Sequence, residues 1–224
     1  DAAIDPWGAI NPDRLCLLVL LISGLSLVGY VVTRWLGPGR GIAVTAAAGG
    51  LASSTAVTLT FVKQSREPNA GARQLAGGIL LAWTVMFGRV VVTATVVAPA
   101  LFAALIVPFA AMLVACGTAA LLCLWHRPPT PAGDVEIKNP FSLWAASKFA
   151  LLFAVVQLLL ELGQEYLPQS GVYTIDAVAG TTDVDAITLS MAQRARSGGG
   201  EVHAAVVAIV IATVSNTLVK AAMA

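Results

Sequence analysis

The chain has 224 residues, of which 58% are apolar and only 11% are charged, and its mean hydropathy is +0.83. A soluble domain carries about 25% charged residues because its water-facing surface needs them, so this composition excludes an ordinary water-soluble domain. The net charge of +1 and the lack of a basic patch with interleaved aromatic residues argue against a nucleic-acid partner. We therefore expect an all-α polytopic membrane protein whose main partner is the lipid bilayer.

Seven stretches are long and apolar enough to cross a bilayer, which takes about 20 residues of helix. In chain order they cover residues 13–36, 41–64, 73–97, 100–125, 141–163, 172–195 and 202–223. Segments rich in Gly, Pro or charged residues separate them, beginning with Gly37-Pro38-Gly39 after the first. The sequence thus predicts a single transmembrane domain over 1–224 with about seven helices.

Basic residues are distributed unequally between the two sets of loops. On the side of the N-terminus lie Arg14, Lys63, Arg66, Arg73, Arg127, Lys138, Lys148, Arg194 and Arg196, and on the other side lie Arg34 and Arg40. Cytoplasmic loops carry the excess of basic residues. The distribution therefore predicts a cytoplasmic N-terminus and an external C-terminus.

The second and sixth spans share a sequence pattern that recurs at one constant offset along the chain. Residues 50–60 (GLASSTAVTLT) align with residues 180–190 (GTTDVDAITLS), and Arg66 aligns with Arg196. The pattern predicts a 3+1+3 arrangement, with repeat one over about 11–98, a linker helix over about 100–125 and repeat two over about 139–224. Because four spans separate equivalent helices, the two three-helix repeats would be parallel, as in some small transporters.

Two carboxylates, Asp183 and Asp185, fall about a dozen residues into the sixth span, near the middle of the membrane. A charged side chain there costs about 2.5–3.5 kcal/mol, so we expect these two to be paired, protonated, hydrated or bound to a cation. On one ideal helix Thr181, Asp185 and Thr188 share a stripe, whereas Asp183 points about 200° away. A local break after Gly180 would bring the carboxylates together and free backbone carbonyls for an ion.

Hydroxyl groups stand at the equivalent positions of the second span. Ser53 and Thr55 align with the two aspartates, and Thr58 aligns with Thr188. Oxygen ligands of this kind suit hard cations. We therefore expect a bound divalent cation such as Mg²⁺ or Mn²⁺, with the two aspartates as its metal ligands.

The third and seventh spans add Arg89, Asn216 and Lys220, and the last two share a helix face because they are four residues apart. Lys220 or Arg89 could lock an aspartate in a buried ion pair, could line a cation or proton pathway, or could hold an anionic or zwitterionic substrate. These alternatives stay open at the level of sequence. No metalloprotease, nucleotide-binding or Ser/His/Asp pattern is present, so we do not expect an enzyme.

Four segments resemble a known family: residues 29–67, 139–156, 179–193 (AGTTDVDAITLSMAQ) and 215–221 (SNTLVKA). They are similar to the membrane domain that often follows an MgtC/SapB-type domain in bacteria, and the resemblance covers essentially the whole chain. It implies a bacterial inner-membrane protein, a role in Mg²⁺ or other cation homeostasis, and an MgtC-like domain as partner. The MgtC-like part itself does not occur in these 224 residues, which leaves open any function that needs both domains.

These observations lead to two hypotheses about function. The first is a membrane transporter or channel for cations, either a divalent metal or a proton-coupled ion, with a mid-membrane site of carboxylates and hydroxyls at the repeat interface. The second is a non-transporting assembly or regulatory module that partners an MgtC-like domain, with the buried charges as a structural ion-pair network. A homo-oligomer is compatible with both.

Overall fold

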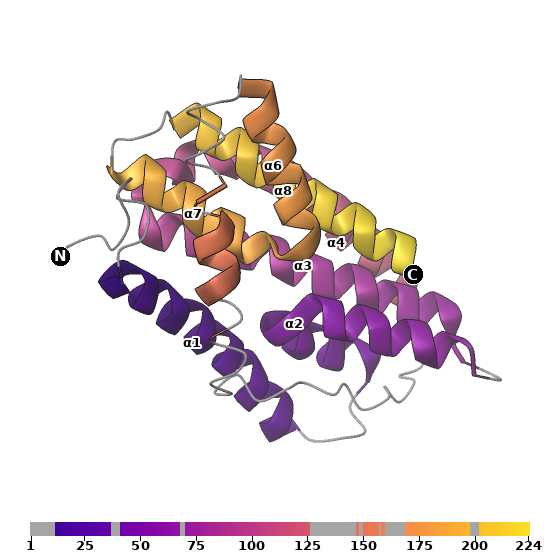
Figure 1. Cartoon of the computed structure of the whole chain (residues 1–224). Coiled ribbons are helices and arrows are strands. Elements are labelled where there is room, and N and C mark those ends of the chain that lie inside the picture. The colour runs from indigo at the N-terminus through magenta and orange to yellow at the C-terminus, as the bar shows by residue number, and fades with distance from the viewer. Residues whose placement is uncertain are drawn as a thin grey trace. The chain divides into compact units, whose positions relative to one another are not determined.

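The computed structural model describes residues 12–36, 41–67, 70–125, 147, 150–156, 158–159, 169–197 and 202–224. Regular structure in these ranges is helical, and they contain no β-strand (Figure 1). In chain order the elements are α1 (Pro12–Leu36), α2 (Ile42–Ser65), α3 (Ala72–Val97), the 3₁₀ turn η1 (Pro99–Leu101), α4 (Phe102–Leu124), α6 (Gln169–Thr182), α7 (Val184–Ser197) and α8 (Val202–Met223). The all-helical class expected from the composition is confirmed.

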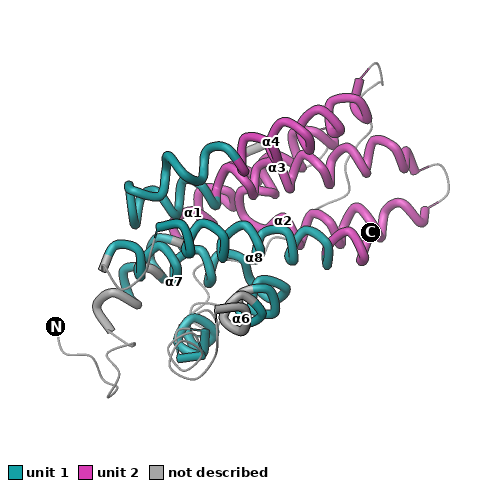
Figure 2. Tube along the Cα trace, turned by 90° about the horizontal axis from the view of Figure 1, so that it is seen from above, with its two compact units in different colours: residues 1–23, 90–107, 141–219 teal, residues 24–89, 108–140, 220–224 magenta. Residues whose placement is uncertain are grey.

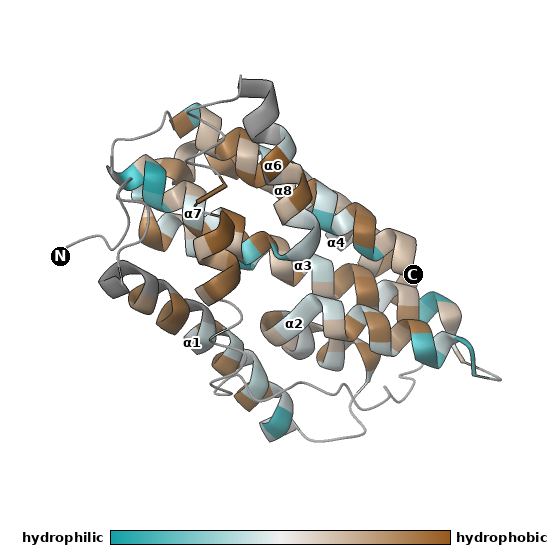
Figure 3. Cartoon of the chain, in the orientation of Figure 1, coloured by the Kyte–Doolittle hydropathy of each residue, from teal (hydrophilic) through white to brown (hydrophobic). Residues whose placement is uncertain are grey.

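Four helical segments of the described ranges are long and apolar enough to cross a membrane. They are Ile42–Ser65, Ala72–Val97, Pro99–Leu124 and Val202–Met223. They agree to within one residue with the second, third, fourth and seventh predicted spans, and Figure 3 shows apolar residues along their lengths. The chain is therefore a helical membrane protein.

The other three predicted spans have different outcomes. A helix, α1, covers residues 13–36, but its apolar stretch Val19–Trp35 is shorter than the four segments above. The predicted span 172–195 is divided between α6 and α7. The predicted span 141–163 lies largely outside the described residues, although its residues 150–156 are helical. A total of seven spans stays a prediction.

The segment Pro99–Leu124, which contains α4, is the most apolar of the four candidate spans. Its most apolar stretch of 18 residues has a mean hydropathy of 2.4, yet only 17% of that stretch is buried inside the protein. Large side chains such as Val107, Val114 and Leu122 are exposed on it. An exposed apolar surface of this kind fits a helix that mostly faces lipid.

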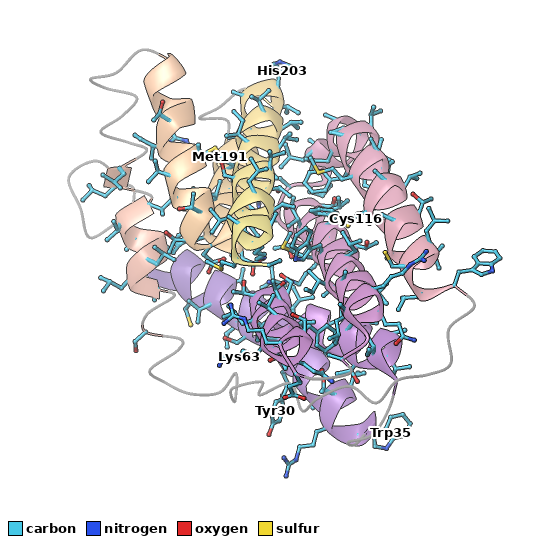
Figure 4. All side chains as sticks on the ribbon, turned by 90° about the vertical axis from the view of Figure 1, so that its right-hand side faces the viewer. Tyr30, Trp35, Lys63, Cys116, Met191 and His203 are labelled. Carbon is cyan, nitrogen blue, oxygen red and sulfur yellow. The ribbon has the colours of Figure 1, made fainter. Side chains whose placement is uncertain are left out.

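The ends of two helices present polar or aromatic groups suited to a membrane surface. Trp35 projects from the last turn of α1 and is 86% exposed, and His203 stands exposed on the first turn of α8 (Figure 4). Tryptophan is enriched where a bilayer meets water because its ring is amphipathic. These positions fit the predicted span boundaries.

By packing, the chain divides into two compact units, which Figure 2 shows in two colours. Unit 1 comprises residues 1–23, 90–107 and 141–219, and unit 2 comprises residues 24–89, 108–140 and 220–224. Thus α2 belongs wholly to unit 2, whereas α6 and α7 belong wholly to unit 1.

A buried glycine brings two helices into close contact in each unit. In unit 2, a Cβ added at Gly50 of α2 would lie 2.9 Å from the Cα of Ala82 in α3. In unit 1, a Cβ added at Gly180 of α6 would lie 2.5 Å from the Cα of Ala212 in α8. Small residues allow helix backbones to approach in this way. The offset that aligns Gly50 with Gly180 also aligns Ala82 with Ala212, so the same contact occurs once in each unit.

Replacing Gly180 by alanine should destabilise the protein, because the new methyl group meets the backbone of α8 and not a flexible side chain. Overpacking of this kind typically costs about 1–3 kcal/mol. The matched control is Gly88→Ala, since a Cβ at Gly88 meets no atom within 4 Å and alanine favours a helix. Thermal unfolding in detergent should show a clear loss for the first variant and none for the second. Equal melting temperatures would contradict the close contact.

Candidate functional site

The helix that was predicted as the sixth span is broken at Asp183. Helix α6 ends at Thr182, α7 begins at Val184, and the two run in different directions (Figure 1). The Asp183 Oδ1 accepts a hydrogen bond from the backbone N–H of Asp185 at 2.8 Å. Asp183 therefore caps the start of α7, as aspartate commonly does at helix N-termini. The break predicted after Gly180 is confirmed.

A second break, which the sequence analysis did not predict, interrupts α2 at Ser53. Its backbone is extended (φ −162°, ψ 101°) between two helical halves. The Ser53 Oγ accepts a hydrogen bond from the backbone N–H of Ala56 at 3.2 Å, and so caps the second half. Ser53 aligns with Asp183 in the internal repeat, and serine and aspartate are both preferred N-cap residues. The repeat alignment contained this signal, because it pairs one N-cap residue with the other.

The turn that follows each break has the same internal hydrogen bond. Thr58 Oγ1 donates to the Ser54 carbonyl at 2.9 Å, and Thr188 Oγ1 donates to the Val184 carbonyl at 2.8 Å. Both threonines are fully buried. They differ in one respect, because Thr58 also accepts a hydrogen bond from the indole Nε1–H of Trp83 at 3.0 Å.

Each break leaves backbone carbonyls at the end of the first half-helix, where no helical N–H follows to bind them. In unit 2 the guanidinium of Arg89 donates through Nη1 to the carbonyls of Leu51 at 2.9 Å and Ala52 at 3.4 Å. In unit 1 the amide Nδ2 of Asn216 donates to the Gly180 carbonyl at 2.9 Å. The carbonyls at the first break thus accept from a charged donor, and the carbonyl at the second break accepts from a neutral donor.

The other end of the Asn216 amide is an acceptor. Because the Gly180 carbonyl can only accept, it fixes the NH₂ group of Asn216 toward itself and orients the amide oxygen away. Asn216 is only 5% exposed, and no described residue donates a hydrogen bond to its Oδ1. Buried polar atoms normally have partners, so this oxygen is suited to a bound ion or water beside the acidic break.

Lys220 reaches the turn that follows the break in α2. Its Nζ donates to Ser54 Oγ at 2.8 Å and contacts Met86 Sδ at 3.0 Å. Lys220 is 4% exposed, so its ammonium lies inside unit 2. Ser54 and Met86 carry no charge and are not among the residues predicted from the sequence, where Lys220 is grouped with the aspartates.

The remaining candidate residues differ in burial. Asp185 is buried, Asp183 and Ser53 are partly buried, and Thr55 and Thr181 are exposed. The stripe that Thr181 and Asp185 would share on one ideal helix does not form, because the break at Asp183 changes the helix direction between them. Whether Ser53 and Asp183 face each other across the repeat interface stays a prediction.

A metal at Asp183 and Asp185 would need neutral ligands as well. Among the described residues, no group of three or more His, Cys, Asp or Glu side chains is placed to hold a metal ion. Mg²⁺ and Ca²⁺ accept carbonyl, amide and water oxygens beside one or two carboxylates. The two aspartates, the Asn216 oxygen and the last carbonyls of α6 are oxygens of these kinds.

Comparison with known proteins places the chain in a family. The model of the family described as "Domain of unknown function (DUF4010)" matches residues 20–224, which include both breaks. The chain belongs to the DUF4010 family. It is also 31% identical over 184 residues to an "Uncharacterized protein" of Aquifex aeolicus (strain VF5), over 81% of this chain and 80% of the relative. No solved structure matches the chain. Membership of this family assigns no activity, so the functional proposal for this DUF4010 protein rests on the chemistry of its site.

Replacing Thr58 by valine should destabilise the protein more than replacing Thr188 by valine. Both changes remove a hydroxyl that donates to its own helix, but only the first leaves a buried Trp83 N–H without its acceptor. An unsatisfied buried donor costs about 1–3 kcal/mol. Thermal melts and the wavelength of tryptophan emission measure the difference. Equal losses of stability with unchanged emission would contradict the indole bond.

Proposed function

We propose that this protein is a membrane transporter or channel for cations, with its ion site at the break between α6 and α7. The observation that carries the proposal is the break between α6 and α7 at Asp183, within the predicted sixth span, together with an amide oxygen of Asn216 to which no described residue donates. Irregular backbone at membrane depth is tolerated only where it is buried in protein or lines a water-filled cavity. Broken helices of this kind hold the ion and substrate sites of many transporters.

The groups at this break favour a cation. Ionised carboxylates, amide oxygens and backbone carbonyls are acceptors only, and here they come from Asp183, Asp185, Asn216 and the end of α6. Hard divalent ions such as Mg²⁺ or Mn²⁺ prefer such ligands. A proton on one of the carboxylates is the alternative charge carrier.

The features that recur at the constant offset of the repeat support two parallel three-helix repeats with α4 as the linker. They are the glycine–alanine contact, the capped break and the threonine bond after it. Three independent local features at the same offset favour a common structural origin over chance similarity of apolar sequence. In the proposed arrangement the two breaks meet at the repeat interface, with Ser53 and Thr55 opposite the aspartates, and seven spans cross the bacterial inner membrane.

One feature favours a second function, that of a regulatory or assembly module without transport. At the break in α2, the charged groups of Arg89 and Lys220 are held by carbonyl, hydroxyl and thioether partners. Such contacts also suit a network that only locks helices together. In that case the protein would act as a partner of an MgtC-like domain, as the sequence resemblance implies. Its aspartates would then not exchange ions.

The proposed topology predicts an external C-terminus. Alkaline phosphatase fused after residue 224 should be active, and green fluorescent protein fused there should not fluoresce. Fusions after residue 67, between α2 and α3, should give the opposite result because this loop carries Arg66 on the predicted cytoplasmic side. A fluorescent fusion after residue 224 would rule out the combination of seven spans and a cytoplasmic N-terminus.

Replacing Asp185 by asparagine separates transport from a structural lock. In a transporter, Asp185→Asn should leave the protein folded, while metal-dependent flux into proteoliposomes and stabilisation by Mg²⁺ or Mn²⁺ disappear. In a structural lock, removing one charge of a buried pair costs about 3–5 kcal/mol, so the melting temperature should fall sharply. Removing the partner charge as well, with Lys220→Met or Arg89→Met, should then restore much of the loss.

The matched control is Glu67→Gln, which removes an exposed carboxylate from the loop after α2. It should change neither flux nor stability, because a surface charge contributes little. A parent protein that shows no metal-dependent flux and no metal-dependent stabilisation, combined with rescue by a double variant, would overturn the transport proposal.

A further inference from the structure

The guanidinium of Arg89 occupies the carbonyl end of the first half of α2. Its Nη1 donates to Leu51 and Ala52, the two residues immediately before the break at Ser53. These carbonyls form the C-terminal end of a half-helix, which carries a partial negative charge from the helix dipole. Arginine remains protonated in proteins. A permanent cation therefore sits at the electronegative end of a broken helix.

The break in unit 1 has a neutral donor in the same role. In the repeat alignment Arg89 corresponds to Val219, whose side chain can neither donate nor carry charge. There the amide of Asn216 donates to the Gly180 carbonyl. Asn216 aligns with Met86 in the first repeat. The same backbone feature is thus satisfied by a tethered cation in one half of the chain and by an amide in the other.

We propose that the break in α2 is a second cation position, filled by the protein's own Arg89 in place of a mobile ion. Freed carbonyls at such breaks coordinate cations in transporters, and here the side chain of α3 supplies the positive charge. Removing that side chain should vacate a position that accepts a small organic cation of guanidinium type. This inference rests on the proposed function in treating the two breaks as equivalent halves, but its test measures binding and not flux.

The different roles proposed for the two breaks follow from the charges at each of them. A fixed guanidinium at one break repels a mobile cation there by like-charge repulsion, whereas the carboxylates at Asp183 and Asp185 attract one. Arg89 would therefore restrict the mobile cation to the acidic break. The protein keeps one broken helix for structure and the other for exchange.

The test uses the purified full chain in detergent and the variant Arg89→Ala. Ethylguanidinium has the charge and shape of the lost side-chain end, and ethylurea has a similar shape and N–H donors without the charge. Ethylguanidinium chloride in the low millimolar range should raise the melting temperature of Arg89→Ala by about 2–4 °C, the shift expected near five times the Kd for a domain of this size. Ethylurea, sodium chloride at equal ionic strength, and ethylguanidinium on the parent should have no such effect.

The matched control is Arg73→Ala. Arg73 also donates from its guanidinium to a carbonyl near a helix end, that of Leu122 at 2.9 Å, but it is exposed and lies at no break. Ethylguanidinium should not rescue this variant. Equal rescue of both variants, or equal rescue of Arg89→Ala by ethylurea, would overturn the proposal because neither result requires a cation position at the break.

A second pair of variants keeps the test decisive if Arg89→Ala does not fold. Arg89→Lys retains the charge, and Arg89→Gln retains hydrogen-bond donors without it. The lysine variant should melt at a higher temperature than the glutamine variant; the reverse order would overturn the proposal. If rescue by ethylguanidinium succeeds while the parent shows no metal-dependent flux, the cation position stands and the proposed transport function fails.

Discussion

A backbone carbonyl that loses its helical partner inside a membrane must find another donor, because hydrocarbon offers none. The rest of this structure depends on that requirement. The helix turns away at Ser53 and again at Asp183, and each time the chain supplies a side chain from a neighbouring helix of the same unit. Arg89 and Asn216 thus bind the carbonyls that the two breaks release. Each interruption thereby offers backbone carbonyls to other groups, where an uninterrupted helix would present only side chains.

The sequence was sufficient for the membrane class, for four spans and for the break at Asp183. The break at Asp183 could be predicted because two carboxylates within a predicted apolar span would cost several kcal/mol unless the local structure accommodates them. Prediction failed at Ser53 because a single serine within a helix has no such cost; its hydroxyl can bond within its own helix. The contacts of Lys220 with Ser54 and Met86 also escaped prediction. Partners far apart in the chain and without charge leave no pattern in a single sequence.

The two units satisfy similar geometry with different chemistry. Gly50 and Gly180 make the same close approach, and Thr58 and Thr188 make the same bond to their own helices. Yet Trp83 binds only the first threonine, and the guanidinium of Arg89 corresponds to the aliphatic side chain of Val219. The backbone packing is alike in the two units, whereas the side chains around it differ.

The high hydropathy and slight burial of α4 bear on the symmetry of the proposed arrangement. A three-span unit ends on the opposite side of the membrane from where it began, so two copies joined directly would be inverted, one inserted upside down relative to the other. One additional crossing restores the starting side. In the proposed arrangement α4 is that crossing, and its role is to make the number of crossings before the second repeat even. Its sequence then needs only length and hydrophobicity, which is what its high hydropathy and its slight burial indicate.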